Sequence, residues 1–176
     1  MKVLLHICCA PCSIYTLESL KSEGMDVLGY FYNPNIHPYT EFVKRLRTLE
    51  NYAAISLLPL TIDKGYEVED FFKGVLEYGK KRCLFCYRMR LEKAFIEGKK
   101  RSVDAVTTTL LYSKYQRHDD IRSTGEELAD RYNVRFLYRD FRVGWKKGIE
   151  ESRRINMYRQ QYCGCLLSER ERFQGL

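Results

Sequence analysis

The order of apolar and amphipathic segments is the feature of this sequence that most restricts its fold. Short apolar runs, each long enough for a strand, lie at 3–7, 26–32, 57–62, 104–111 and 134–138. Helical patterns lie between them at 11–23, 39–55, 67–78, 83–98 and 121–132. Because parallel strands need crossover connections, this alternation predicts an α/β fold with a mostly parallel sheet. We expect a single Rossmann-like domain over residues 1–176, with a basic, partly helical tail from Gly144.

Polar and metal-binding side chains follow the predicted strands at their carboxyl ends. In sheets of this type, ligands bind at that edge, near a switch in strand order. The residues that come directly after the first, second, fourth and fifth strands are Cys8, Cys9 and Cys12; Asn33, Asn35 and His37; Tyr112, Ser113, Lys114 and Gln116; and Arg139, Asp140 and Arg142. A functional site is therefore predicted at this edge of the sheet.

The seven cysteines fall into three groups and none stands alone. The apolar run Val3–Ile7 is too short for a secretory signal, and no apolar run approaches the ~20 residues that span a bilayer. We therefore expect a cytoplasmic protein that makes no use of a membrane. In a reducing compartment, grouped cysteines are more often metal ligands or redox catalysts than structural disulfides.

Two of the cysteine groups have the spacing of metal ligands. The pair Cys83 and Cys86 can direct both sulfurs at one metal or cluster, although thioredoxin-type redox sites use the same spacing. Two sulfurs from the Cys8, Cys9 and Cys12 group would complete a set of four thiolates. Such a set suits a [4Fe-4S] cluster or a tetrahedral zinc ion equally, and buried core thiols without metal are a third interpretation.

The pair Cys163 and Cys165 differs from the other two groups. A disulfide across one intervening residue closes a small, strained ring that is easily reduced. This favours a redox-active pair, although a CxC pair can also chelate a metal.

The charge balance favours an anionic partner, because 30 Lys and Arg stand against 23 Asp and Glu, a formal net charge of +7. Nucleic acid is the commonest such partner. Candidate phosphate contacts are Lys80–Arg82, Arg88, Arg90, Lys146, Lys147, Arg153, Arg154 and Arg159. Candidate aromatic residues for stacking on an unpaired base are Tyr87, Trp145, Tyr158 and Tyr162.

Five segments together resemble the cysteine-rich, cobalamin-independent (QueH-like) epoxyqueuosine reductase family. They are LLHICCAPC, CLFCYRMRL, TTTLLYSKYQ, YRDF and YCGC, and they are spread over nearly the whole chain. The resemblance implies an adenine-nucleotide α-hydrolase-like fold, an iron–sulfur centre and the last step of queuosine synthesis on tRNA. In that step the epoxide of epoxyqueuosine at the wobble position loses its oxygen and becomes an alkene. An electron donor, unidentified from the sequence, is also implied.

The resemblance further implies roles for individual residues. Cys8, Cys9, Cys83 and Cys86 match the cluster ligands, and Cys163 with Cys165 matches the redox-active pair. Cys12 and Asp140 are left as candidate ligands of an additional mononuclear iron, which could polarise the epoxide C–O bond.

Asp140 has further interpretations, as a catalytic proton donor, a helix cap or a surface ion pair. His37, Tyr112 and Lys114 are candidate proton donors by their location alone.

Two rival functions remain open at the level of sequence. A tRNA sulfurtransferase-like iron–sulfur enzyme would need a glycine-rich phosphate loop after the first strand, but CCAPCS stands there without glycine. A zinc-stabilised RNA-binding module without catalysis would use the same four thiolates.

Overall fold

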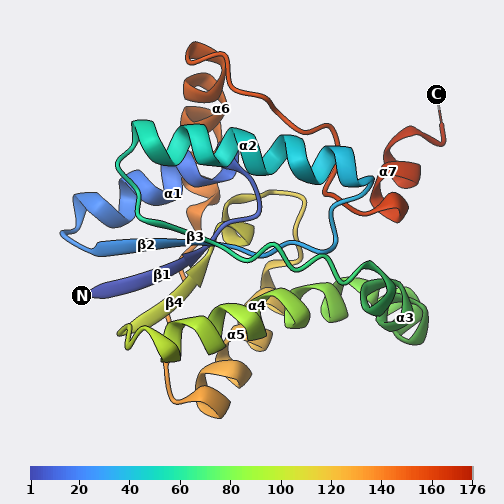
Figure 1. Cartoon of the computed structure of the whole chain (residues 1–176), viewed down its shortest axis with the longest axis horizontal. Coiled ribbons are helices and arrows are strands. Elements are labelled where there is room, and N and C mark those ends of the chain that lie inside the picture. Colours follow the sequence, from blue (N-terminus) through green and yellow to red (C-terminus); the bar gives the residue numbers. More distant parts are fainter. Residues whose placement is uncertain (176) are drawn as a thin grey trace.

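A five-stranded parallel sheet forms the centre of the computed structural model, which describes residues 1–175 (Figure 1). The strands pair in the order β3-β2-β1-β4-β5. Their bounds are β1 Lys2–His6, β2 Asp26–Phe31, β3 Leu60–Ile62, β4 Ala105–Thr108 and β5 Arg135–Phe136. The predicted α/β class with a parallel sheet is therefore confirmed.

Helices cover both faces of this sheet (Figure 1). On one face lie α1 (Ala10–Ser22), α2 (Tyr39–Ile55) and α6 (Trp145–Arg154), with α1 in contact with both of the others. On the opposite face, α4 (Arg82–Lys100) packs between α3 (Val68–Tyr78) and α5 (His118–Tyr132). A last helix, α7 (Leu166–Phe173), follows a long connection from α6. The tail is thus partly helical, as its pattern predicts.

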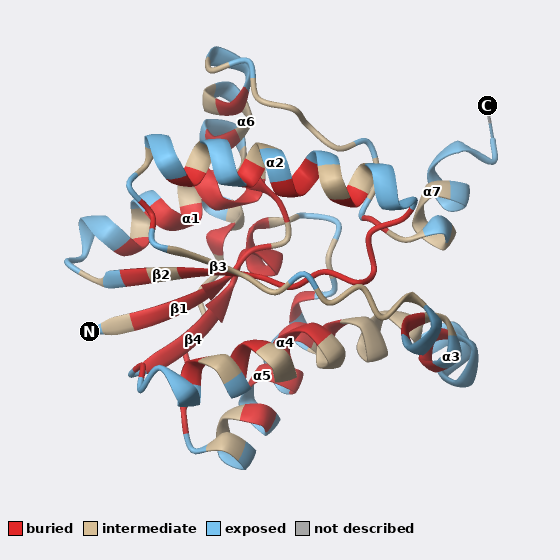
Figure 2. Ribbon diagram, in the orientation of Figure 1, coloured by how far each residue is buried: buried red, intermediate tan, exposed pale blue. Residues whose placement is uncertain are grey.

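The hydrophobic core lies where the central strands meet the two helical layers, and Figure 2 shows β1 and β4 buried along most of their length. Val3, Leu4 and Leu5 are fully buried because helices cover both faces of β1. Within residues 1–175, no helix combines the length and the apolar character needed to cross a bilayer.

Three strand predictions are too long, and the fifth strand covers only Arg135–Phe136 of the expected 134–138. The fourth strand ends at Thr108 and not at Leu111, because the Thr108 hydroxyl accepts a hydrogen bond from the Leu110 amide at 3.1 Å. That contact starts a 3-10 turn, η2 (Thr109–Tyr112), in place of further strand. The third strand begins only at Leu60, because Leu57 has a left-handed backbone conformation, with φ of 51°.

The helix terminators agree better with the pattern. Asn133 ends α5 in the left-handed conformation, with φ of 53°, as its position after an amphipathic run predicts. Gly24 follows α1 with φ of 72°. These short turns return the chain to the amino edge of the sheet. The loops at the opposite, carboxyl edge can therefore form a site.

Candidate active site

The strand order places a crevice at the carboxyl ends of β1 and β4. The chain leaves β1 in one direction to reach β2, while β4 lies on its other side, which makes this the switch point of the sheet. Cys8 follows β1, and Thr109 follows β4. The Cys8 amide donates to the Thr109 hydroxyl oxygen at 3.0 Å, and the hydroxyl donates to the Cys8 sulfur at 3.2 Å. The first cysteine group therefore lies at the edge where the sequence predicts a site.

Helix α1 gathers the first three cysteines into one cluster. Cys9 is the N-cap residue of α1 and Cys12 lies in its first turn, so the two sulfurs are 2.9 Å apart. The Cys8 sulfur lies 3.8 Å from that of Cys9, and all three sulfurs are within 4.8 Å of one another. A helix N-terminus favours negative charge, which suits thiolates. The cluster can hold a metal ion.

Cys83 and Cys86 lie in the first turns of α4. Their spacing of three puts both on one side of the helix. The turn η1 (Gly79–Lys81) leads directly into the first residue of α4.

The segment that carries Cys163 and Cys165 is fastened to α2. Arg45 is buried in α2, and its guanidinium donates to the carbonyl oxygens of Cys163 at 2.8 Å and Tyr162 at 3.2 Å. The His37 amide donates to the carbonyl of Gly164 at 2.8 Å. A side chain at Gly164 would place its Cβ 2.9 Å from the side-chain nitrogen of Asn35, which would have to shift. Glycine avoids this contact.

The three cysteine groups meet in one cavity of about 720 Å³. Its lining includes Cys8, Cys12, Cys83, Cys86, Cys163 and Cys165. Cys9 is buried next to Cys12. The predicted convergence of sulfurs that are far apart in the chain is confirmed as a matter of position, and all seven thiols are free.

The thiols of the first cluster do not share negative charge equally. Hydrogen bonds from Cys12 and Cys9 lower the pKa of Cys8 well below its ordinary value. The same hydrogen bond to Cys8 raises the pKa of Cys12, and burial raises that of Cys9. Burial also raises the pKa of Cys86, to about 12. Cys8 is therefore the member of this cluster that ionises first, stabilised by the S–H groups beside it.

Two glutamine side chains donate to sulfur. The Gln160 amide nitrogen lies 2.8 Å from the Cys9 sulfur, and that of Gln116 lies 3.2 Å from the Cys163 sulfur. The Tyr87 hydroxyl holds Gln116 by donating to its amide oxygen at 2.9 Å. Sequence reasoning places Gln116 after the fourth strand but misses Gln160, whose one signal is its closeness to the YCGC segment.

Asp140 is not among the residues that line the cavity. Its carboxylate accepts from the Arg142 backbone amide at 3.0 Å and from the Arg142 guanidinium at 2.6 Å and 2.8 Å. These hydrogen bonds lower the pKa of Asp140 to about 2, so the group is ionised at neutral pH and is a poor proton donor. The contacts are those of the capping and ion-pair interpretations, since Asp140 precedes the turn η3 (Phe141–Gly144).

The candidate proton donors differ in position. His37 is buried and stacks on Phe72, away from the cavity lining. Tyr112 lines the cavity, although its hydroxyl donates to the Trp145 carbonyl at 3.0 Å. Lys114 lies over the ring of Trp145, which lines the cavity.

Two of the predicted RNA contacts do not lie on the outer surface. Arg90 is only 2% exposed, and Tyr87 is buried with its hydroxyl bound to Gln116, although both line the thiol cavity. Both lie on the inner side of α4, where the apolar stripe of the helix faces the sheet. Arg159 instead lines the cavity, as does the exposed Arg117, which the pattern did not single out.

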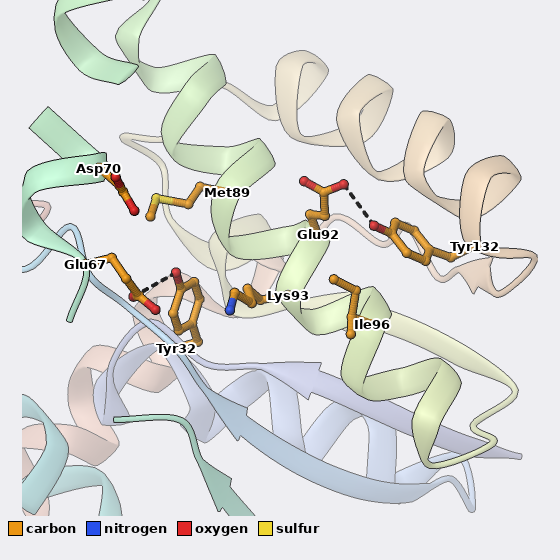
Figure 3. A pocket seen from close by; sticks show the side chains of 8 residues that line it. All are labelled: Tyr32, Glu67, Asp70, Met89, Glu92, Lys93, Ile96 and Tyr132. Atoms are coloured by element: carbon orange, nitrogen blue, oxygen red, sulfur yellow. Dashed lines mark hydrogen bonds between the residues drawn. The ribbon is translucent and has the colours of Figure 1, made fainter. Parts of the chain in front are cut away.

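A second cavity of about 340 Å³ lies away from the cysteines, between α3, α4 and α5. Figure 3 shows two of its three carboxylates bound by phenol groups, with the Tyr32 hydroxyl donating to Glu67 at 3.1 Å and that of Tyr132 to Glu92 at 2.9 Å. No cysteine lines this cavity. Its chemistry is therefore separate from that of the thiol-lined cavity.

The fold and the site define a Rossmann-type α/β protein with a thiol-lined cavity at the switch point of its sheet. A sequence model described as "Epoxyqueuosine reductase QueH" matches residues 3–171 of the chain. The chain belongs to this epoxyqueuosine reductase family, as the motifs CCAPC, CxxC and CxC predict.

Named relatives agree with this assignment, and one solved structure has a similar fold. The chain is 36% identical to epoxyqueuosine reductase QueH of Dehalococcoides mccartyi, over 98% of this chain and 94% of that protein. It is 33% identical to that of Thermotoga maritima, over 97% of this chain and 91% of that protein. A predicted subunit of a tRNA methyltransferase from Methanocaldococcus jannaschii has a similar fold, with a TM-score of 0.57 at 14% identity, covering 87% of this chain and 74% of that one.

Proposed function

We propose that this protein reduces epoxyqueuosine in tRNA to queuosine, using a metal centre held in the thiol-lined cavity. The observation that carries the proposal is the meeting of the three cysteine groups at the carboxyl edge of the sheet, in a chain of the epoxyqueuosine reductase family. This combination supports a redox reaction at that edge.

The cavity fits an iron–sulfur centre by its chemistry. Its candidate ligands are all sulfur, the donor that iron–sulfur clusters and zinc prefer. The residues that line the cavity also include buried polar atoms without a partner among residues 1–175, namely Nη2 of Arg90, Nε of Arg82 and Oδ1 of Asn35. In our proposal Cys8, Cys9, Cys83 and Cys86 hold the cluster.

The position of Cys12 within the sulfur cluster supports this residue as a ligand of an additional mononuclear iron. Asp140 would first have to break its ion pair with Arg142, so the structure supports Asp140 less than Cys12 as a ligand of that iron.

The proposed reaction balances with the redox pair as the immediate reductant. The Cys163 and Cys165 thiols give up two electrons and two protons as their disulfide forms. The two C–O bonds of the epoxide break, a C=C bond forms, and the oxygen leaves as water. A bound iron–sulfur centre would supply electrons one at a time, so two electrons from an external donor, together with two protons, would restore the dithiol. Gln116 positions Cys163 by donating to its sulfur.

The charge of the cavity lining supports an anionic substrate. Five arginines, among them Arg117, Arg159 and Arg172, line the cavity beside a single carboxylate, that of Glu171, and the whole chain carries a net charge of +7. Cations in this place can hold the phosphates on either side of a modified nucleotide.

The decisive experiment is mass analysis of nucleosides from epoxyqueuosine-containing tRNA, after anaerobic incubation with the iron-loaded protein and dithionite. We expect queuosine to replace epoxyqueuosine with the wild-type protein. A Cys163→Ser/Cys165→Ser variant that still binds tRNA is the matched control and should give no more than traces. Unchanged epoxyqueuosine in the presence of a fully loaded wild-type protein would overturn the proposal.

The three-sulfur geometry of Cys8, Cys9 and Cys12 also favours a second candidate, a zinc-stabilised RNA-binding module. Anaerobic purification separates the two candidates. A brown protein with iron and acid-labile sulfide supports the reductase, whereas a colourless protein with one zinc ion supports the module. The sulfurtransferase alternative has less support, because only Ile7, Cys8 and Cys9 separate β1 from α1. ATP turnover by the pure protein would support the sulfurtransferase alternative.

A further inference from the structure

A buried arginine without a carboxylate partner lies among the cysteines. Arg90 comes from the middle of α4, is 2% exposed, and lines the thiol cavity. Its Nε donates to the carbonyl oxygen of Cys86 at 3.1 Å, one turn back in the same helix. Its Nη2 has no hydrogen-bond partner within residues 1–175.

The missing partner is an anion. Among residues 1–175, no Asp or Glu forms an ion pair with Arg90, whereas the chain's other fully buried arginine, Arg45, is paired with Glu41 at 2.7 Å. Burying a guanidinium away from water is strongly unfavourable unless an opposite charge compensates it. A fold that keeps Arg90 in this place therefore provides negative charge nearby.

The groups that can supply this charge are the cysteines that share the cavity with Arg90. Cys8 after β1, Cys86 in α4 and Cys163 in the C-terminal segment line the same cavity as the guanidinium. Cysteines bind a metal as thiolates, so a metal centre held by them would bring negative charge to Arg90. One guanidinium thus shares a cavity with cysteines from three separate segments.

We propose that Arg90 is the built-in counter-charge of the thiolate centre: a positioning residue that favours metal binding there and raises the reduction potential of the bound centre. A metal held by several thiolates is a net anion, and reduction makes it more negative. A fixed cation at short range in a water-poor cavity stabilises the more negative state. This role rests on the proposed function only for the identity of the metal.

Three variants of α4 test this role. Arg90→Met removes the charge at similar volume, Arg90→Lys keeps a charge, and Arg88→Met removes a surface charge, since Arg88 pairs with Glu127 on the outer side. Arg88→Met is the matched control for net charge, because it differs from Arg90→Met in location and not in the charge removed.

The first readout is the affinity of the reduced, metal-free full chain for Co²⁺, followed by the sulfur-to-cobalt absorption band. We expect Arg90→Met to weaken binding by at least about tenfold, Arg90→Lys to recover most of the loss, and Arg88→Met to change little. The second readout is the midpoint potential of the iron-loaded protein, which should become more negative in Arg90→Met alone.

The outcomes separate this role from the proposed function. If Arg90→Met unfolds, Arg90→Lys and an Arg90→Gln variant provide the same comparison in the loaded protein. If the variants at residue 90 keep the wild-type cobalt affinity and midpoint potential, even with a lower Tm, then Arg90 has a structural role only. A wild-type chain that binds cobalt but never assembles iron and sulfide would overturn the iron–sulfur centre and leave the counter-charge role standing. Failure to bind either metal would overturn both.

Discussion

Arg45 in α2 donates from Nη1 to the backbone carbonyl of Cys163 at 2.8 Å, across 118 residues of sequence. The same side chain donates from Nε to Glu41 at 2.7 Å, and the Tyr158 hydroxyl donates to the other oxygen of that carboxylate at 2.6 Å. The segment that carries the CxC pair is therefore held against α2 at several points. We interpret the pair as a fixed part of the cavity wall.

Replacing Arg45 should release this segment. Arg45→Met leaves the half-buried Glu41 with only the Tyr158 hydroxyl as a partner and removes two hydrogen bonds to backbone carbonyls, so we expect the free energy of unfolding to fall by about 3 kcal/mol. We also expect faster alkylation of Cys163, measured by peptide mass spectrometry under native conditions. Arg47→Met is the matched control, because Arg47 is exposed on the same helix. Equal alkylation rates in both variants would contradict the docking role.

The two kinds of cysteine should respond differently to substitution. Cys86→Ser removes one proposed cluster ligand, so iron, acid-labile sulfide and activity should be lost together. Cys163→Ser should keep the iron and sulfide of the wild-type protein but stop both single and multiple turnover, because no disulfide can form. Metal analysis beside single- and multiple-turnover assays checks both. An iron-free Cys163→Ser protein would show that our division of roles is wrong.

Binding of tRNA should depend steeply on salt. Contacts between cations and phosphate release counterions, so the affinity should fall by at least about tenfold between roughly 50 and 200 mM salt. An Arg117→Gln/Arg159→Gln variant, changed at the cavity, should show a shallower dependence. A Lys99→Gln/Lys100→Gln variant loses the same charge at the opposite end of α4 and should behave as wild type. Affinity that is insensitive to salt would remove the phosphate contacts from the proposal.

Gly125 should be required for stability despite its place inside a helix. In an open helix position, alanine is better than glycine by about 1 kcal/mol. At 125, however, a Cβ would lie 2.4 Å from the Phe136 ring, where α5 packs on β5. We therefore expect Gly125→Ala to lower the free energy of unfolding by about 1 to 2 kcal/mol in urea titrations.

A control and a rescue make this expectation specific. Ser123→Ala, on the exposed side of α5, should change stability by no more than about 0.5 kcal/mol. Combining Gly125→Ala with Phe136→Leu should recover part of the loss, since the smaller side chain makes room. A stabilised Gly125→Ala protein would mean that β5 moves away freely.

Local patterns predict the fold well and the site only in part. The period of the apolar residues places α2 at Tyr39–Ile55 as observed, because an amphipathic helix records its buried face in its own sequence. The same reasoning misassigns Arg90 to the surface. A basic residue in a helical pattern is ordinarily solvated. The burial of Arg90 becomes favourable only because this residue lines the thiol cavity on the inner side of α4.

By itself, the sequence determines the order of strands and helices, the three cysteine groups and the family motifs, because each of these depends on residues that are near one another in the chain. Only the tertiary structure decides that Cys8, Cys86 and Cys163 share one cavity with a buried Arg90, and that Asp140 pairs with Arg142 outside it. The physical reason is that these relationships depend on crossovers and helix packing that join distant segments. No local propensity records which distant side chain will be the neighbour of another.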